Sequence, residues 1–185
     1  MSVLTSNILV PHGREEAWRF TPLNRLKGLH DGSAAIATHR SLSLKSASVP
    51  GVTFERVSRE LLPSLSTTDD AIMNRVREFS TDVAVLKIAA NSELTEPIHL
   101  NRESFDLSSA EYSRVLIHVG SNARATVIAS NTGNTLLAEE IEFKVESGAS
   151  LTFVTLQEWD SQTVHVAKHH AIVDKDAIFK SITVT

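Results

Sequence analysis

The residues best suited to chemistry in this sequence are three closely spaced histidines, His165, His169 and His170. Histidine is the commonest protein ligand for metal ions, so such a group raises the question of a metal site. On a β-strand, however, His169 and His170 point to opposite faces, and His165 lies about 13 Å from His169 along the chain. We therefore expect a solvated or partner-facing strand here, and we assign none of the three histidines a role.

Paired carboxylates are the second candidate, because some hydrolytic enzymes need two of them in one cleft. The pairs are Glu15-Glu16, Asp69-Asp70 and Glu139-Glu140. The first two pairs are explained by the favourable interaction of acidic residues with a helix N-terminus. The third pair precedes an expected strand, on which neighbouring residues alternate faces. No catalytic pair is predicted.

Other reactive motifs are absent from the sequence. It contains no cysteine, no Gly-x-Ser-x-Gly and no Gly-x-x-x-x-Gly-Lys, which excludes thiolate chemistry, the nucleophile elbow of hydrolases and a phosphate-binding loop. Trp18, Trp159 and Tyr112 do not alternate with basic residues, so base stacking has no platform. We predict no catalytic, cofactor-binding or metal-ligating residue, no cofactor in these residues, and no enzyme activity.

Charge and hydropathy restrict the partners and the compartment. The net charge of −4 and the pI of about 6.1 supply no general attraction to nucleic acid or to an anionic membrane. The first ten residues lack the basic start and apolar run of a signal peptide, and no stretch of 18 apolar residues occurs. We expect a soluble, cytoplasmic protein that binds neither nucleic acid nor membrane.

A four-fold repeat indicates the elements that must position these residues. Its four segments open at Ile88, Val119, Val145 and Val173, with spacings of 31, 26 and 28 residues. Three positions after each opening residue stands a residue type that tolerates a left-handed backbone, and a small residue follows it. These corner residues are Asn91, Asn122, Gly148 and Asp176. Strand-like alternation between the corners predicts a parallel β-helix with one coil per repeat.

Counting back from the opening residues in steps of two defines columns of equivalent residues. The columns expected to face inward are Leu86, Ile117, Phe143 and Ala171, then Ala84, Val115, Ile141 and His169. The intervening columns are more polar and should face outward. Val85, Leu116 and Ile172 are apolar exceptions on that outer face, so we expect another segment or a partner to cover part of it.

The first 80 residues have a different, partly helical pattern. Residues 21 to 28 read as a short helix with a Thr-Pro start and a glycine stop. Thr67 with Asp70 resembles a helix start, and an apolar stripe of Ile72, Met73, Val76 and Phe79 follows. We divide the chain into a helical and irregular N-terminal cap, residues 1–80, and the first coils of the β-helix, residues 81–185.

The N-terminal region also carries a family resemblance. Residues 16–23, Glu-Ala-Trp-Arg-Phe-Thr-Pro-Leu, resemble the segment E-x-W-[RK]-[YF]-T-x-L near the start of SufD-type members of the SufB/SufD family. These proteins belong to the iron–sulfur cluster assembly machinery of bacteria and plastids. Glu96-Pro97-Ile98 and the coils at 115–130 and 141–157 resemble the same family. The resemblance covers essentially all 185 residues but only about the first half of a family member.

The resemblance implies a helical N-terminal region, a right-handed parallel β-helix and a C-terminal helical region. It further implies a non-catalytic scaffold subunit of a SufB–SufC–SufD complex, concerned with iron acquisition and cluster assembly. Family members pair with SufB through the later β-helix and bind the ATPase SufC through the C-terminal helices. The family's interface residues have no counterpart in this sequence, so no functional residue is carried over.

Two other functions stay open on the residues alone. One is a carbohydrate-active parallel β-helix enzyme, and the other is a plain protein-binding solenoid. The sequence ends within a strand-like run, Ile182-Thr183-Val184-Thr185, from which we expect a fragment that lacks the ATPase-binding region and a homodimer formed through the exposed C-terminal strand edge.

Overall fold

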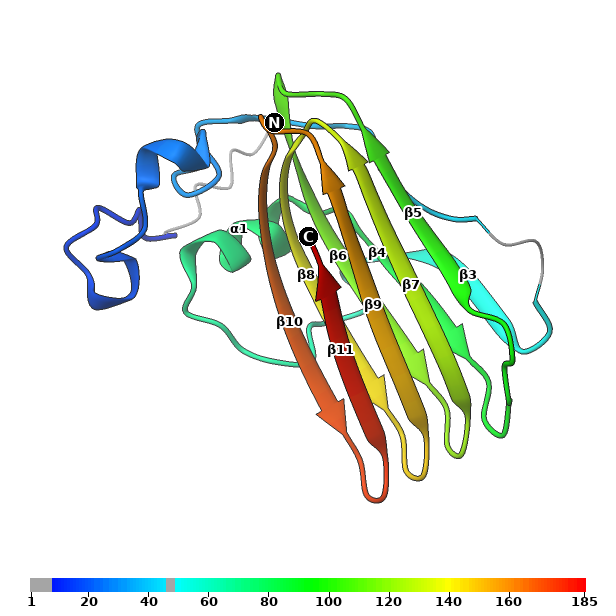
Figure 1. The fold of residues 1–185 in the computed structure, drawn as a ribbon. Helices are drawn as coiled ribbons and strands as arrows, with labels where there is room; N and C mark the ends of the chain where they lie inside the picture. The colour runs from blue at the N-terminus through cyan, green and yellow to red at the C-terminus, as the bar shows by residue number, and fades with distance from the viewer. Residues whose placement is uncertain (1–7, 46–48) are drawn as a thin grey trace.

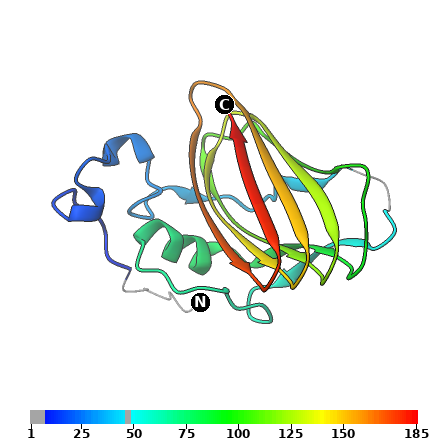
Figure 2. The same ribbon diagram turned by 60° about the horizontal axis from the view of Figure 1, so that its bottom comes forward.

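The computed structural model describes residues 8–45 and 49–185 and has two sheets that form the opposite faces of a flattened solenoid (Figures 1 and 2). Sheet A contains β4 (Asp82–Ile88), β6 (Ser109–Val119), β8 (Leu136–Val145) and β10 (Val164–Val173) as parallel neighbours. Sheet B contains β5 (Ile98–Ser104), β7 (Arg124–Gly133), β9 (Ser150–Trp159) and β11 (Ile178–Val184) in the same arrangement. Each coil supplies one strand to each sheet, so the predicted parallel β-helix is confirmed.

The four predicted corners stack in register. Asn91, Asn122 and Asp176 have φ between 58° and 60°, and Gly148 has φ of 71°. The corner N–H of Asn91 donates to Ser121 O on the next coil, and the corner N–H groups of Asn122 and Gly148 continue this pattern. The repeat in the sequence is therefore a repeat of the left-handed corner that turns the chain from sheet A into sheet B.

The inward columns also occur as predicted. Leu86 pairs with Ile117, Ile117 with Phe143, and Phe143 with Ala171 in the parallel ladders of sheet A. These residues belong to one hydrophobic core that runs along the solenoid between the two sheets. Phe143 packs edge-on against Phe153 of sheet B, with 4.8 Å between the ring centroids.

The N-terminal region contains short helical pieces and three strands. They are η1 (Glu16–Trp18), η2 (Leu23–Leu26), β1 (Ala35–Ile36), β2 (Leu42–Leu44), β3 (Val52–Ser58) and α1 (Ala71–Phe79). The Thr-Pro start was expected to begin a helix at Pro22, but η2 begins one residue later. The division at residue 80 stays a prediction; the change from helical to strand pattern lies between α1 and β4. The first seven residues, where no signal peptide is predicted, lie outside the described part of the chain.

Strands cover the first coil where helices were expected. β3 pairs antiparallel with β4, and β2 pairs antiparallel with β5, so the unpaired edge of each sheet is closed by main-chain hydrogen bonds. Helix α1 lies instead on the outer face of sheet A, against β6 and β8. The predicted helix start was also displaced, because Asp70 itself is the N-cap and accepts hydrogen bonds from the N–H groups of Ile72 and Met73.

The apolar residues predicted to be covered on the outer face of sheet A are covered by the chain itself. Val85 and Leu116 are buried beside Val83, and Val57, Leu62 and Leu65 pack onto them. Ile172 in the last coil stays half-exposed. Within the two described ranges, no helix is both long and apolar enough to cross a membrane.

Candidate functional site

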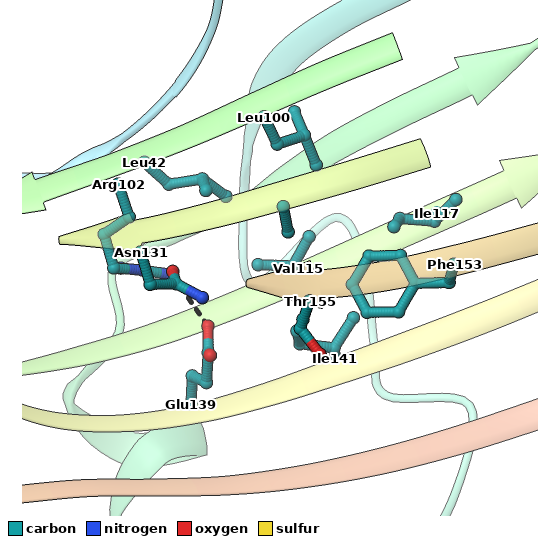
Figure 3. A pocket seen from close by; sticks show the side chains of 11 residues that line it. Leu42, Leu100, Arg102, Val115, Ile117, Asn131, Glu139, Ile141, Phe153 and Thr155 are labelled. Atoms are coloured by element: carbon teal, nitrogen blue, oxygen red, sulfur yellow. Dashed lines mark hydrogen bonds and ion pairs between the residues drawn. The ribbon is translucent and has the colours of Figure 1, made fainter. Parts of the chain in front are cut away.

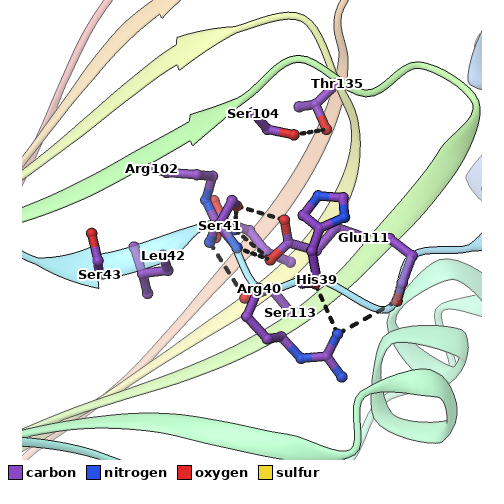
Figure 4. A network of polar contacts seen from close by, with 12 residues as sticks. His39, Arg40, Ser41, Leu42, Ser43, Arg102, Ser104, Glu111, Ser113 and Thr135 are labelled. Atoms are coloured by element: carbon purple, nitrogen blue, oxygen red, sulfur yellow. Dashed lines mark hydrogen bonds and ion pairs between the residues drawn. The ribbon is translucent and has the colours of Figure 1, made fainter.

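A network of charged side chains lies inside the solenoid, next to the apolar core (Figure 4). Its centre is Arg102 on β5, which is 1% exposed. Glu111 on β6 and Glu139 on β8 point inward toward it, and they are 1% and 3% exposed. Burial of three ionised groups is costly unless they pair closely, so their geometry decides whether the site is tolerated.

Arg102 holds the two carboxylates from opposite ends of its guanidinium group. Its Nη1 lies 3.1 Å from Glu111 Oε1, and its Nη2 lies 2.7 Å from Glu139 Oε2. Ser41, just before β2, donates a hydrogen bond from its hydroxyl to Glu111 Oε2 at 2.5 Å and accepts one from Arg102 Nη1 at 3.0 Å. The network thus connects the segment at β2 to three successive coils of the solenoid, through β5, β6 and β8.

The electrostatics of Glu139 follow from this geometry. Burial acts to raise its pKa, but Arg102 and His165 act more strongly in the opposite direction and hold the pKa at about 2. His165 Nε2 lies 2.8 Å from Glu139 Oε1. Glu139 is therefore ionised at neutral pH, and one guanidinium serves two carboxylates with an imidazole at the end of the chain of contacts.

The three candidate histidines separate as the strand pattern predicts. His165 and His169 on β10 share the inward face, where His169 packs edge-on against Phe143 and Phe153 at 5.7 Å between ring centroids. Burial lowers the pKa of His169, and the neighbouring Glu139 opposes that shift. His170 lies on the outer face beside Glu142 in the ladder.

His165 also contacts the indole of Trp159. Trp159 Nε1 donates to His165 Nδ1 at 3.3 Å, and the two ring centroids are 5.6 Å apart. This contact assigns Nδ1 as the acceptor, so the proton of a neutral His165 sits on Nε2, which faces Glu139. Among the described residues, no group of three or more His, Cys, Asp or Glu side chains converges as a metal site would require.

A small cavity lies beside Arg102, bounded by Asn131, Glu139 and Thr155 on its polar side and by core residues on the other (Figure 3). Its volume is about 10 Å³, which is about the space that one water molecule needs. The interior can therefore hold ionised groups and a single solvent molecule, but it has no room for an organic substrate.

The acidic pair Glu139-Glu140 divides between the two faces, as predicted. Glu139 enters the interior network, whereas Glu140 faces outward and is buried under α1, where Arg77 Nη2 lies 2.5 Å from Glu140 Oε1. Glu142, two residues further on, accepts a hydrogen bond from the N–H of Leu65 at 2.6 Å. These outward carboxylates fasten the segment before α1, and α1 itself, onto sheet A.

Sequence reasoning missed Arg102, Glu111 and the inward role of Glu139. The signal was present in the columns, because one further step back from Ile141 and Val115 gives Glu139 and Ser113, which are paired in the ladder. A polar column that continues an apolar inward column indicates a buried polar layer. The partner on β5 could not be found in this way, because it belongs to the opposite sheet.

The fold and this sealed interior define a structural class: a parallel β-helix with a buried network of ion pairs next to its apolar core. Residues 100–185 match the family model described as "SUF system FeS cluster assembly, SufBD core domain". The chain is 30% identical over 177 residues to iron–sulfur cluster assembly SufBD family proteins of Mycobacterium bovis and Mycobacterium tuberculosis, covering 95% of this chain and 44% of the relative. A SufBD family protein of Mycobacterium leprae is 34% identical over 179 residues, covering 95% and 45%.

The chain belongs to the SufBD family of iron–sulfur cluster assembly proteins. It spans somewhat less than half of the length of these curated relatives.

Proposed function

We propose that the protein is a SufD-type scaffold subunit of a SufB–SufC–SufD complex and that it contributes to cluster assembly without catalysing a reaction itself. The observation that carries the non-catalytic part is the sealing of the charged groups. Arg102, Glu111 and Glu139 are each at most 3% exposed and bind one another. A catalytic carboxylate has to reach its substrate, and the cavity beside these groups is water-sized.

The family and the segment Trp18-Arg19-Phe20-Thr21-Pro22 support the more specific assignment. The mycobacterial relatives are named assembly proteins of the SufBD family. In the structure Trp18 packs against the cluster formed by α1, β6 and β8, while Phe20 is 86% exposed. The SufD-like segment thus provides both an anchor to the solenoid and an exposed aromatic side chain.

Co-purification tests this proposal. The full-length protein that contains this chain is expressed with SufB and SufC homologues of the same organism, and a stable ternary complex is expected. Recovery of SufB with SufC while this protein stays apart would contradict the proposal.

The proposed compartment is the cytoplasm, and the family resemblance is the reason for this proposal. Fractionation of cells producing the tagged full-length protein checks it, and recovery with the membrane fraction after a salt wash would contradict it. Edge pairing of two copies also stays a prediction, since β11 is hydrogen-bonded to a neighbouring strand, β9, on one side only within the described residues.

A further inference from the structure

The outer face of sheet B carries an apolar stripe. The stripe consists of Ile128, Val154, Leu156, Ile182 and Val184. Ile128, Val154 and Ile182 are neighbours in one row of the ladder, and Leu156 and Val184 form the next row. The stripe residues of β7 and β9, which are Ile128, Val154 and Leu156, are half-exposed. Those of β11, Ile182 and Val184, are 47% and 51% exposed.

The two outer faces of the solenoid differ in their cover. Helix α1 packs on β6 and β8 of sheet A, and the segment before α1 helps to cover the apolar residues of β4 and β6. Figure 1 views sheet B directly, and no other described element crosses β7, β9 or β11. An uncovered row of Ile, Val and Leu on a flat sheet is typical of an interaction surface.

The charges around the stripe indicate what fits there. The middle of the stripe lies at the level of Thr155 on β9, between the row of Val154 and the row of Leu156. Lys180 pairs with Thr152 in the ladder, three residues before this level. Glu158 follows three residues after that level, on β9. Each charge therefore lies about 10 Å from a line that crosses the strands through the middle of the stripe. Both side chains are exposed, and neither is among the ion pairs found in the described residues.

A two-fold axis along that line exchanges the two ends of the stripe. A second copy turned about this axis places its Glu158 opposite Lys180 of the first copy, displaced by one strand spacing of about 4.8 Å. The symmetry forms this pair twice, and both side chains are long enough to span the displacement. Arg124 and Asp160 are also exposed and lie five residues before and five residues after the same level. The same axis therefore places Asp160 of one copy opposite Arg124 of the other.

We propose that two copies of this chain pack face to face through the sheet B stripe, with Lys180 of each copy paired with Glu158 of the other. The occupant of the face is a second copy because both the apolar row and the charges around it are self-complementary under one two-fold axis. Two sheets packed in this way lie about 10 Å apart with interdigitating side chains.

Charge reversal tests the proposal on the 185-residue chain by sedimentation over a series of concentrations at low salt. We expect a dimer that Val154→Glu abolishes, because a carboxylate then enters the apolar contact. Lys180→Glu and Glu158→Lys should each raise the dissociation constant about fivefold or more. The double variant K180E/E158K should return to within about twofold of the original value, because both pairs are restored.

Lys175→Glu is the matched control, since Lys175 is exposed at a corner away from the stripe; it should leave the dimer unchanged. Circular dichroism and thermal unfolding check that each variant is folded. Three results would overturn the proposal: a monomer at every concentration, a double variant that stays dissociated, or a dimer that survives Val154→Glu. The last result is the one expected of pairing through the β11 edge.

Discussion

Arg102 supplies the positive charge that balances two buried carboxylates inside the solenoid. A single guanidinium pairs with two carboxylates that are almost fully buried. Replacement by an apolar side chain of similar length would leave Glu111 and Glu139 close together without a counter-charge.

We therefore expect Arg102→Met to lower the free energy of unfolding by about 3–5 kcal/mol, the usual cost of breaking a buried ion pair on one side. Urea unfolding followed by circular dichroism measures it. Arg19→Met, which removes an exposed arginine, is the control and should change stability by less than about 0.5 kcal/mol. Equal effects of the two substitutions would show that the interior network is not a structural ion pair.

Glu139 makes the stability of the protein depend on acid. Its pKa in the folded protein is about 2, below the ordinary value of 4.5. A carboxylate with a lowered pKa stabilises the fold above its unfolded pKa, and the stabilisation is lost as the pH falls from about 4.5 toward 2. We expect about 3 kcal/mol of stability to disappear in this range.

The Glu139→Gln variant should be less stable at pH 7 and should lose less stability on acidification, since it has no proton to bind at this position. Unfolding free energies at several pH values between 7 and 3 provide the comparison. Glu16→Gln, at an exposed position, serves as the control and should follow the pH profile of the original protein. A Glu139→Gln profile parallel to that of the original protein would contradict the assignment.

At the scale of the elements, corners and caps set where each strand and helix begins. Corner residues with positive φ need either glycine or a residue such as Asn or Asp that tolerates the left-handed region. Gly148 and Gly133 have φ of 71° and 100°, but they differ in what a side chain would meet. A Cβ at Gly148 would lie 2.5 Å from the side-chain oxygen Oδ1 of Asn122, whereas at Gly133 it would clash with the main-chain oxygen of Ser104.

Gly133→Ala should therefore destabilise the protein more than Gly148→Ala. We expect about 1–2 kcal/mol for Gly148→Ala from the left-handed backbone, and a larger loss for Gly133→Ala because the main chain of β5 has to move. Thermal unfolding of the two variants under identical conditions gives the order. The reverse order would mean that Asn122 cannot turn away.

The N-cap of α1 offers a second prediction at this scale. Asp70→Ala removes the acceptor for the N–H groups of Ile72 and Met73 and should cost about 1 kcal/mol. Asp69→Ala is the matched control, because Asp69 is exposed and precedes the cap. Urea unfolding should separate the two variants, and equal losses would argue against Asp70 as the N-cap.

At the scale of the whole molecule, stability should vary along the solenoid, because each coil contacts only its neighbours. β6 and β8 have strands on both sides and buried faces, whereas β11 is largely exposed. Hydrogen exchange at a concentration low enough to prevent association should find the slowest amides in β6 and β8 and faster exchange in β11. Equally slow amides in all coils would indicate a single cooperative unit.

Much of the architecture was predictable because it depends on the types of single residues and on their regular spacing. Asn91, Asn122, Gly148 and Asp176 each mark a left-handed corner by their own residue type, and their spacing reveals the coil. Alternation along each strand then separates inward from outward residues. The outward apolar residues Val85 and Leu116 even predicted a covering segment, although the sequence did not show that the chain supplies it.

The column pattern indicates a polar layer at Glu139, but the ion pairs and hydrogen bonds made there were not predictable from the same information. Arg102 meets Glu139 across the two sheets, 37 residues away, and Ser41 meets Glu111 from 70 residues away. Neither separation in sequence is a multiple of the repeat length. In the sequence, the two carboxylates look like ordinary charged residues of a strand. The closure of the first coil by β2 and β3 was missed for a similar reason, because antiparallel pairing with a solenoid edge has no period.

By itself, the sequence determined the corners, the period, the inward columns and the family resemblance, since each depends on residue type and regular spacing. Only the tertiary structure decided which charges are buried together, which strands close the first coil and which face of the solenoid stays uncovered. The physical reason is that ion pairs and packed faces are made across coils and between sheets, where sequence separation carries no information about distance in space.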